Sequence, residues 1–221
     1  MTGESASFSN PAGVILAGGR STRMGGSSKA LMTLDGKPLL QHVIERVRPQ
    51  TEALYLSVES ENRDYDRFGL EQLPDPVPGH SGPLGGLLAA LRRLPQDAPA
   101  EWLLLVPCDA PFIPADLGKR LLEHACAEGS DGAVVVATGE LQPTFSLWNR
   151  SITPVVVRAV LDDGMAGFKQ FLRRHALAEL RWKGNDPETG APPFFNINDR
   201  DALDRARQFL TDPVENDRCS V

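Results

Sequence analysis

The segment Leu16–Leu31 (LAGGRSTRMGGSSKAL) combines glycines with cations in a pattern that suits a phosphate-rich ligand. Its glycines allow the backbone to turn sharply and to approach a ligand closely. Arg20, Arg23 and Lys29 supply cationic donors, and no Asp or Glu occurs between residues 5 and 34. With 29 acids in 221 residues, about four would fall in that span by composition alone. An acid-free, cationic loop in an acidic chain favours binding of a polyanion such as a triphosphate.

The spacing of this loop differs from two common phosphate-binding glycine loops. Five residues separate Gly19 from Gly25, and Gly-Lys-Ser/Thr is absent, so the loop is not a P-loop. It does not fit GxGxxG either, which lowers the support for nicotinamide enzymes. The alternative interpretation is an ordinary strand–helix turn with surface cations. The coincidence of Gly, Arg and Lys after a buried strand favours the ligand-binding interpretation.

Asp109 is the second candidate for chemistry. It lies in LLLVPCDAPF, directly past a continuous apolar run that is typical of a strand covered on both faces. Ligands of open α/β sheets bind at the carboxyl ends of strands, and the glycine loop leaves such an end too. An Asp at this edge can hold Mg²⁺, which uses one or two carboxylates together with substrate phosphates. The alternative role of Asp109 is a turn residue or helix cap ahead of Pro114.

Hydrophobic periodicity predicts the elements that must position these side chains. Short apolar runs predict strands at Ala12–Ala17, Ala53–Val58, Trp102–Val106 and Gly132–Val136, with a further strand at Thr144–Trp148 that could run antiparallel. Helical spacing predicts helices at Pro38–Arg48, Leu84–Leu94, Pro114–Ala127, Met165–His175 and Arg200–Leu210. The alternation indicates an α/β fold. We expect a single-domain, Rossmann-like three-layer sandwich with a mainly parallel sheet, helices on both faces and one antiparallel strand.

The composition bounds the class of protein. We expect one domain over residues 11–211, with flexible tails at 1–10 and 212–221. The formal net charge of −6 argues against a general nucleic-acid-binding surface. The three cysteines are scattered and indicate neither a disulfide framework nor a zinc site. The chain has no apolar signal segment and no run near the ~20 residues that span a bilayer. We therefore expect a cytoplasmic protein with no membrane partner.

Several motifs together resemble those of the molybdenum cofactor guanylyltransferases. They are LAGGRSTRMGGSSKAL, then Asp75, GPLGGLLAAL (residues 82–91), PCDAPF (107–112), QPTFSLWNR (142–150) and FFNINDRDAL (194–203). The match runs in order from about residue 12 to 210. The first loop alone would indicate only the wider nucleotidyltransferase superfamily, whereas the whole set is much more specific.

The resemblance implies an Mg²⁺-dependent enzyme that moves GMP from GTP to molybdopterin-bound molybdenum, releasing pyrophosphate. It implies nucleotide contacts from Leu16, Ala17, Gly18, Gly19, Arg20, Arg23, Lys29, Ser57, Asp75, Gly82 and Asp109. Among these, Arg23, Lys29 and Asp109 would be catalytic, with Asp109 as the metal ligand. Gln142, Asn196 and Asn198 would lie toward the acceptor. The alternative for the two asparagines is capping of the helix that begins near Asp199.

Three positions depart from the usual pattern of that family. Ser28 stands where the family often has Asp, and Ser57 where some members have a nucleotide-contacting Asn. The segment Gly164–Ala166 lacks an arginine pair that is frequent there. The last departure bears on the acceptor more than on the nucleotide.

Two other functions compete with this interpretation. One is a cytidylyltransferase or another nucleotidyltransferase with a different phosphate acceptor. The cytidylyl relatives typically have Leu-Ala-Ala-Gly where this chain has Leu-Ala-Gly-Gly, which favours guanine. The other is a nucleotide-binding sensor without turnover, against which the intact Arg23, Lys29 and Asp109 argue. We expect a monomer, and a transient contact with a protein that delivers or accepts the cofactor stays open.

Overall fold

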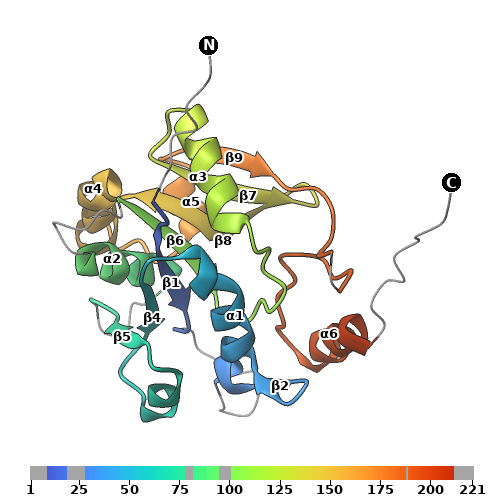
Figure 1. Cartoon of the computed structure of the whole chain (residues 1–221). Coiled ribbons are helices and arrows are strands. Elements are labelled where there is room, and N and C mark those ends of the chain that lie inside the picture. Colours follow the sequence, from blue (N-terminus) through green and yellow to red (C-terminus); the bar gives the residue numbers. More distant parts are fainter. Residues whose placement is uncertain (1–8, 19–27, 78–81, 95–100, 188, 212–221) are drawn as a thin grey trace, which may run out of the picture.

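A computed structural model describes residues 9–18, 28–77, 82–94, 101–187 and 189–211 of the chain (Figure 1). Its strands are β1 Ala12–Leu16, β2 Thr33–Leu34, β3 Lys37–Pro38, β4 Leu54–Val58, β5 Glu71–Pro74, β6 Trp102–Pro107, β7 Gly132–Ala137, β8 Glu140–Asn149 and β9 Ala178–Arg181. Its α-helices are α1 Leu39–Val47, α2 Pro83–Arg93, α3 Leu117–Ala127, α4 Thr153–Val157, α5 Phe168–Leu172 and α6 Arg200–Thr211. Short 3₁₀ helices lie at Lys29–Leu31, Arg48–Gln50, Arg63–Phe68 and Arg150–Ile152, and a π-helical turn at Arg158–Asp162.

Seven strands form one mixed sheet in the order β5-β4-β1-β6-β8-β7-β9. The pairs β5–β4, β4–β1, β1–β6 and β7–β9 are parallel. Strand β8 runs antiparallel to both β6 and β7, between which it lies. The α/β class, the mainly parallel sheet and the single antiparallel strand are therefore confirmed.

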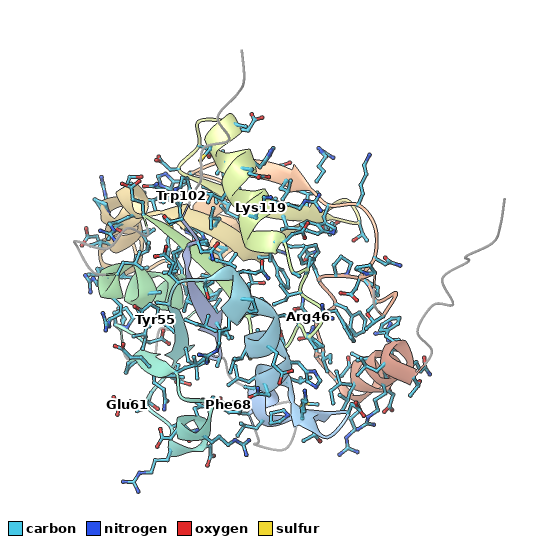
Figure 2. The ribbon with its side chains drawn as sticks, in the orientation of Figure 1. Arg46, Tyr55, Glu61, Phe68, Trp102 and Lys119 are labelled. Carbon is cyan, nitrogen blue, oxygen red and sulfur yellow. The ribbon has the colours of Figure 1, made fainter. Side chains whose placement is uncertain are left out.

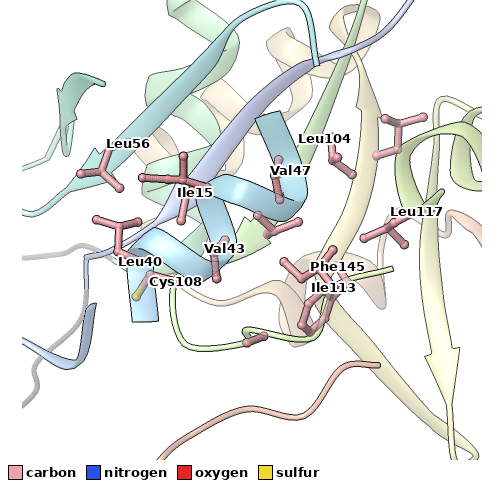
Figure 3. Close-up of a cluster of buried hydrophobic side chains, with 14 of the residues drawn as sticks. Ile15, Leu40, Val43, Val47, Leu56, Leu104, Cys108, Ile113, Leu117 and Phe145 are labelled. Carbon is pink, nitrogen blue, oxygen red and sulfur yellow. The ribbon is translucent and has the colours of Figure 1, made fainter. Parts of the chain in front are cut away.

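Helices cover both faces of the sheet because its central strands are apolar on both sides. On one face, Ile15 of β1 and Leu104 of β6 pack against Leu40 and Val43 of α1 and Leu117 of α3 (Figure 3). On the other face, alternate residues of the same two strands pack against α2 and against the chain from α4 to α5. The edge strand β9 alternates between half-buried and exposed residues, as expected of a strand with one covered side.

Helix α6 lies apart from the sheet, beside the β2–β3 hairpin (Figure 1). A smaller apolar cluster joins Leu34 and Leu39 near the hairpin to Ile197 and to Ala202 and Leu203 of α6. This cluster attaches the last part of the described chain to the segment that follows the glycine loop. In the part of the chain that the structure describes, no helix has the length and apolar character needed to cross a bilayer.

The sequence missed several elements and placed others imprecisely. The β2–β3 hairpin, β5, β9 and α4 were not predicted, because they are short and carry few apolar residues or a proline. The helix expected at Met165–His175 is reduced to α5, and the one expected from Pro114 begins only at Leu117. The other predicted helices and strands agree with the structure within one or two residues at most ends, and β8 extends farther than expected.

Candidate functional site

The carboxyl end of β1 is held between its two neighbouring strands. The carbonyl of Leu16 accepts a hydrogen bond from the Cys108 amide at 3.1 Å, and the Ala17 amide donates to the Ser57 carbonyl at 2.8 Å. Gly18, the next residue, is exposed. The strand is therefore held on both sides up to Ala17, and the next residue, Gly18, is open to a ligand.

Asp75 lies beside this strand end, at the start of the chain that follows β5. Its amide donates to the Val58 carbonyl at 3.0 Å, which extends the β4–β5 pairing. A Cβ added at Gly18 would lie 3.8 Å from Asp75 Oδ2, and one added at Gly85 would lie 3.3 Å from Oδ1. The carboxylate thus lies between the end of β1 and the first turn of α2, and the two glycines leave room for it.

The start of α2 packs closely against two other segments. A Cβ at Gly86 would overlap Ser57 Oγ and would lie 2.6 Å from Leu16 Cδ2. A Cβ at Gly82 would overlap the Ala166 carbonyl, to which the Leu84 amide donates at 3.2 Å. The first packing seats buried Ser57 beneath the helix. The second brings the Gly164–Ala166 segment, which lacks the arginine pair, against the start of the same helix.

Lys29, Asp109 and Asn198 come together from three distant parts of the chain. Lys29 Nζ lies 3.5 Å from Asp109 Oδ2 and donates a hydrogen bond to Asn198 Oδ1 at 2.6 Å. Lys29 follows the glycine loop, Asp109 follows β6, and Asn198 precedes α6. The sequence predicted Asp109 and the glycine loop at the carboxyl ends of strands, and the family resemblance placed Asn198 toward the acceptor. The structure brings Lys29, Asp109 and Asn198 together.

Burial dominates the electrostatics of Asp109. Its side chain is 16% exposed, and this desolvation raises the pKa of the carboxyl. The charge of Lys29 and its hydrogen bond act in the opposite direction and lower that pKa, but burial is the larger effect. Asp109 does not cap α3, which begins at Leu117. Burial also raises the pKa of the neighbouring Cys108 thiol, so that this cysteine is no nucleophile at neutral pH.

The donor set around Asp109 fits one kind of metal site. Among the described residues, no group of three or more His, Cys, Asp or Glu side chains is placed to hold a metal ion. A zinc or calcium cage built from protein ligands would need such a group. Mg²⁺ binds through one or two carboxylates with phosphates and water as its other ligands, so a single carboxylate beside a phosphate site fits it.

The segment that carries Asn198 is tied directly to the end of β6. The Ile197 amide donates to the Asp109 carbonyl at 2.8 Å. Asp199 caps α6, because its Oδ1 accepts a hydrogen bond from the Ala202 amide at 2.7 Å. The capping alternative is therefore wrong for Asn198, whose amide oxygen binds Lys29 instead. Asn196, two residues earlier, is half-buried in the same segment.

A buried ion pair that the sequence did not indicate holds the turn before this segment. Asp186, with a side chain 1% exposed, lies 3.4 Å from an Arg46 guanidinium nitrogen and accepts from the amide and hydroxyl of Thr189 at 2.9 Å. Arg46 lies on the side of α1 that faces the chain leading into α6 (Figure 2). Farther on, Phe194 packs edge-on against Phe145 of β8. An acid and a base 140 positions apart give no local sequence pattern, so only the fold reveals this pair.

The remaining predicted residues divide into two groups. Gly19, Arg20 and Arg23 lie outside the described residues. Gln142 is half-buried on β8. It lies four positions before Ser146, the residue of β8 at which the pairing with β6 ends. No hydrogen bond or ion pair joins Gln142 to Asp109 within the described part of the chain.

The family model and the sequence relatives agree on one family. Residues 13–180 match the model of the MobA-like NTP transferase domain. A protein of Rhizobium meliloti (strain 1021) named molybdenum cofactor guanylyltransferase is 37% identical over 213 residues, which cover 95% of this chain and 96% of that protein.

Solved structures share the fold. Molybdopterin-guanine dinucleotide biosynthesis protein A from Archaeoglobus fulgidus has a TM-score of 0.70 at 23% identity, covering 90% of this chain and 98% of that one. A protein of Mycobacterium tuberculosis H37Rv in complex with manganese has a TM-score of 0.62 at 18% identity, covering 90% and 99%. With the family model over most of the chain and a full-length relative above 30% identity, the chain belongs to the MobA-like NTP transferase family.

Proposed function

We propose that the protein is a molybdenum cofactor guanylyltransferase that moves GMP from GTP to a molybdopterin-type acceptor. The observation that carries the proposal is the meeting of Lys29, Asp109 and Asn198 at the carboxyl edge of the sheet. A phosphate-binding cation, a single metal-binding carboxylate and an amide there suit transfer between two phosphate-bearing substrates. The full-length relatives named molybdenum cofactor guanylyltransferase support the choice of substrates.

The nucleotide binds along the end of β1. The base lies against the backbone of Leu16, Ala17 and Gly18, where the exposed glycine leaves room beside the strand. The Asp75 carboxylate, which lies between Gly18 and Gly85, accepts hydrogen bonds from the donor edge of guanine. Ser57 is buried under α2, where it lies against Gly86.

The triphosphate extends from there toward Lys29. The ammonium has three donors, so it can keep its bond to Asn198 while it neutralises a phosphate oxygen. Arg20 and Arg23 of the glycine loop, with Gly19, bind the rest of the triphosphate. Asp109 would hold Mg²⁺, and the bound ion would supply neutralisation of phosphate charge. The manganese-bound structure of a distant relative in fold supports a divalent ion in this architecture.

Transfer needs positioning and charge stabilisation more than proton transfer. A phosphate oxygen of the acceptor attacks the α-phosphorus of GTP, the new P–O bond forms, and the bond to the β-phosphate oxygen breaks to release pyrophosphate. The acceptor phosphate is already ionised near neutral pH, so no general base is required. Asn196, Asn198 and Gln142 orient the acceptor through amide hydrogen bonds.

A turnover experiment tests the proposal. The purified protein is mixed with Mg²⁺, molybdopterin-type acceptor and GTP, CTP or ATP, and pyrophosphate release is followed together with the dinucleotide product. We expect GTP-dependent release that requires the acceptor and stops on addition of a chelator. Equal turnover with CTP would reject the guanine assignment, and binding of GTP without release would favour the sensor alternative.

A further inference from the structure

A buried tyrosine is hydrogen-bonded to the residue that precedes Lys29. Tyr65 OH and Ser28 Oγ lie 2.6 Å apart, although 37 positions separate them in the chain. Tyr65 is 4% exposed, and its ring belongs to the apolar cluster on the α1 side of the sheet. The hydroxyl of this buried residue thus has a specific partner, which is the residue next to the candidate phosphate-binding lysine.

The turn that carries Lys29 is closed by its own backbone hydrogen bonds and packs against the same apolar cluster. The 3₁₀ helix Lys29–Leu31 is closed by hydrogen bonds from the Leu31 amide to the Ser28 carbonyl at 3.0 Å and from Met32 to Lys29 at 3.1 Å. Ala30 is buried in the same cluster as Tyr65, while the Lys29 side chain reaches Asp109 and Asn198. The Ser28 hydroxyl therefore fixes the start of a single turn whose next residue enters the site.

Tyr65 itself is held firmly from the sheet. The 3₁₀ helix Arg63–Phe68 is capped by Asn62, whose side chain accepts from the Asp64 amide at 2.9 Å. Gln72 of β5 then accepts from the Asn62 amide at 2.9 Å and donates to the Asn62 carbonyl at 3.0 Å. The tyrosine is thereby fixed to an edge strand of the sheet, independently of the chain around Lys29.

We propose that Tyr65 is a positioning residue for Lys29, acting through the Ser28 hydroxyl to set where the ammonium meets the nucleotide phosphates. This inference rests on the proposed function, which gives Lys29 its phosphate. Burial raises the pKa of the Tyr65 phenol, so the hydroxyl stays protonated and able to donate at neutral pH. A phenylalanine ring would fill the same space in the core, so packing alone does not require the hydroxyl of Tyr65.

The other tyrosine of the chain, Tyr55, supplies a matched control. Tyr55 is also buried, at 7% exposure, and its ring lies under the guanidinium of Arg93. Tyr65→Phe and Tyr55→Phe each remove one hydroxyl and keep the ring. We expect Tyr65→Phe to raise the Kd for Mg²⁺–GTP and the KM for GTP by about three- to tenfold, the usual effect of one hydrogen bond. The KM for the acceptor and all values for Tyr55→Phe should stay within about twofold.

Variants of the partner residue separate positioning from a general loss of stability. Ser28→Ala should reproduce the effect of Tyr65→Phe, and the double variant should be no worse than either single one, because both remove the same bond. Ser28→Thr keeps a hydroxyl and should restore GTP binding. Equal changes in the KM values of both substrates, or additive effects in the double variant, would overturn the proposal.

A measurement without substrate keeps this test separate from that of the function. Hydrogen exchange of the Leu31 and Met32 amides, which close the Lys29 turn, should be faster in Tyr65→Phe than in Tyr55→Phe. If the unmodified protein does not bind GTP, the proposed function fails, while the exchange rates still decide whether Tyr65 holds the turn. Unchanged exchange in Tyr65→Phe would overturn the positioning role whatever the substrate.

Discussion

Replacing Asp109 by Asn should separate the activity of this protein from its stability. The substitution keeps the size of the side chain and removes one charge from a group that is 16% exposed. At 3.5 Å, Lys29 attracts the carboxylate by about 4–5 kcal/mol at an effective dielectric constant of about 20. Burial outweighs that attraction, because the pKa of Asp109 is raised rather than lowered. The folded protein thus favours the neutral form at this position.

The substitution should therefore leave the stability unchanged or raised while it lowers the activity. Asp109→Asn should be as stable as the unmodified protein at pH 7 or more so, and each 1 kcal/mol gained would raise Tm by about 2–4 °C for a chain of this size. Its kcat/KM should fall more than about a hundredfold, because a neutral amide is a poor ligand for Mg²⁺ and a loss of about 3 kcal/mol in the transition state suffices.

The pH dependence gives a second check with a definite sign. A carboxyl whose pKa is raised on folding binds its proton more tightly in the folded state, so it destabilises the protein as the pH rises above its unfolded value of about 4. The stability gained by Asp109→Asn should be absent below that pH, grow as the pH rises and level off above the folded pKa. Urea denaturation from pH 3.5 to 7, with Asp163→Asn as a control at an exposed ion pair, measures it. A folded variant with full turnover, or one that is less stable at pH 7, would refute the reasoning.

Three further substitutions test other parts of the site. Lys29→Met should weaken GTP binding at least about tenfold, and unchanged affinity by calorimetry would contradict this. It should also lower the free energy of unfolding by about 1–3 kcal/mol at pH 7, because Asp109 loses its cation. Adding Asp109→Asn should restore the stability but not the binding. Asn198→Ala should raise the KM of the acceptor by about tenfold and leave α6 intact by circular dichroism, since Asp199 caps that helix; equal effects on both substrates would count against an acceptor role. Gly86→Ala should cost about 1–3 kcal/mol in urea denaturation, because its Cβ overlaps Ser57 and Leu16; a cost below about 0.5 kcal/mol would show that α2 can shift.

The sheet and the site could be predicted from sequence to different extents. β1 and β6 were predicted because strands covered on both faces are continuous apolar runs, and α1 because its buried residues recur at helical spacing. The edge strand β5 is four residues long with one buried residue, which leaves no periodicity to detect. The position of β8 between β6 and β7 depends on pairing across the sheet, which local pattern does not encode.

The residues of the site also differ in how far the sequence predicted them. The glycine loop and Asp109 follow strands that end at one edge of a parallel sheet, so strand assignment indicated that both can face one crevice. Asn198 needed the family motif, and its bond to Lys29 emerged only from the fold. Tyr65 and Asp186 contact residues that are distant in the sequence. Their neighbours in the sequence carry no sign of those contacts.

The place of β8 in the sheet has a consequence for the order in which the growing chain can fold. A nascent chain that has emerged from the ribosome as far as Ala137 exposes β1, β4, β5, β6 and β7, but β8, the native neighbour of β6 on its open side, has not yet emerged. During that interval the apolar edge of β6 exposes unpaired backbone groups, a hazard for association between chains. It also offers a place to β7 itself, through an ordinary right-handed crossover by way of α3. Released chains truncated after residue 137 should therefore bind chaperones more than chains truncated after Asn149, the last residue of β8.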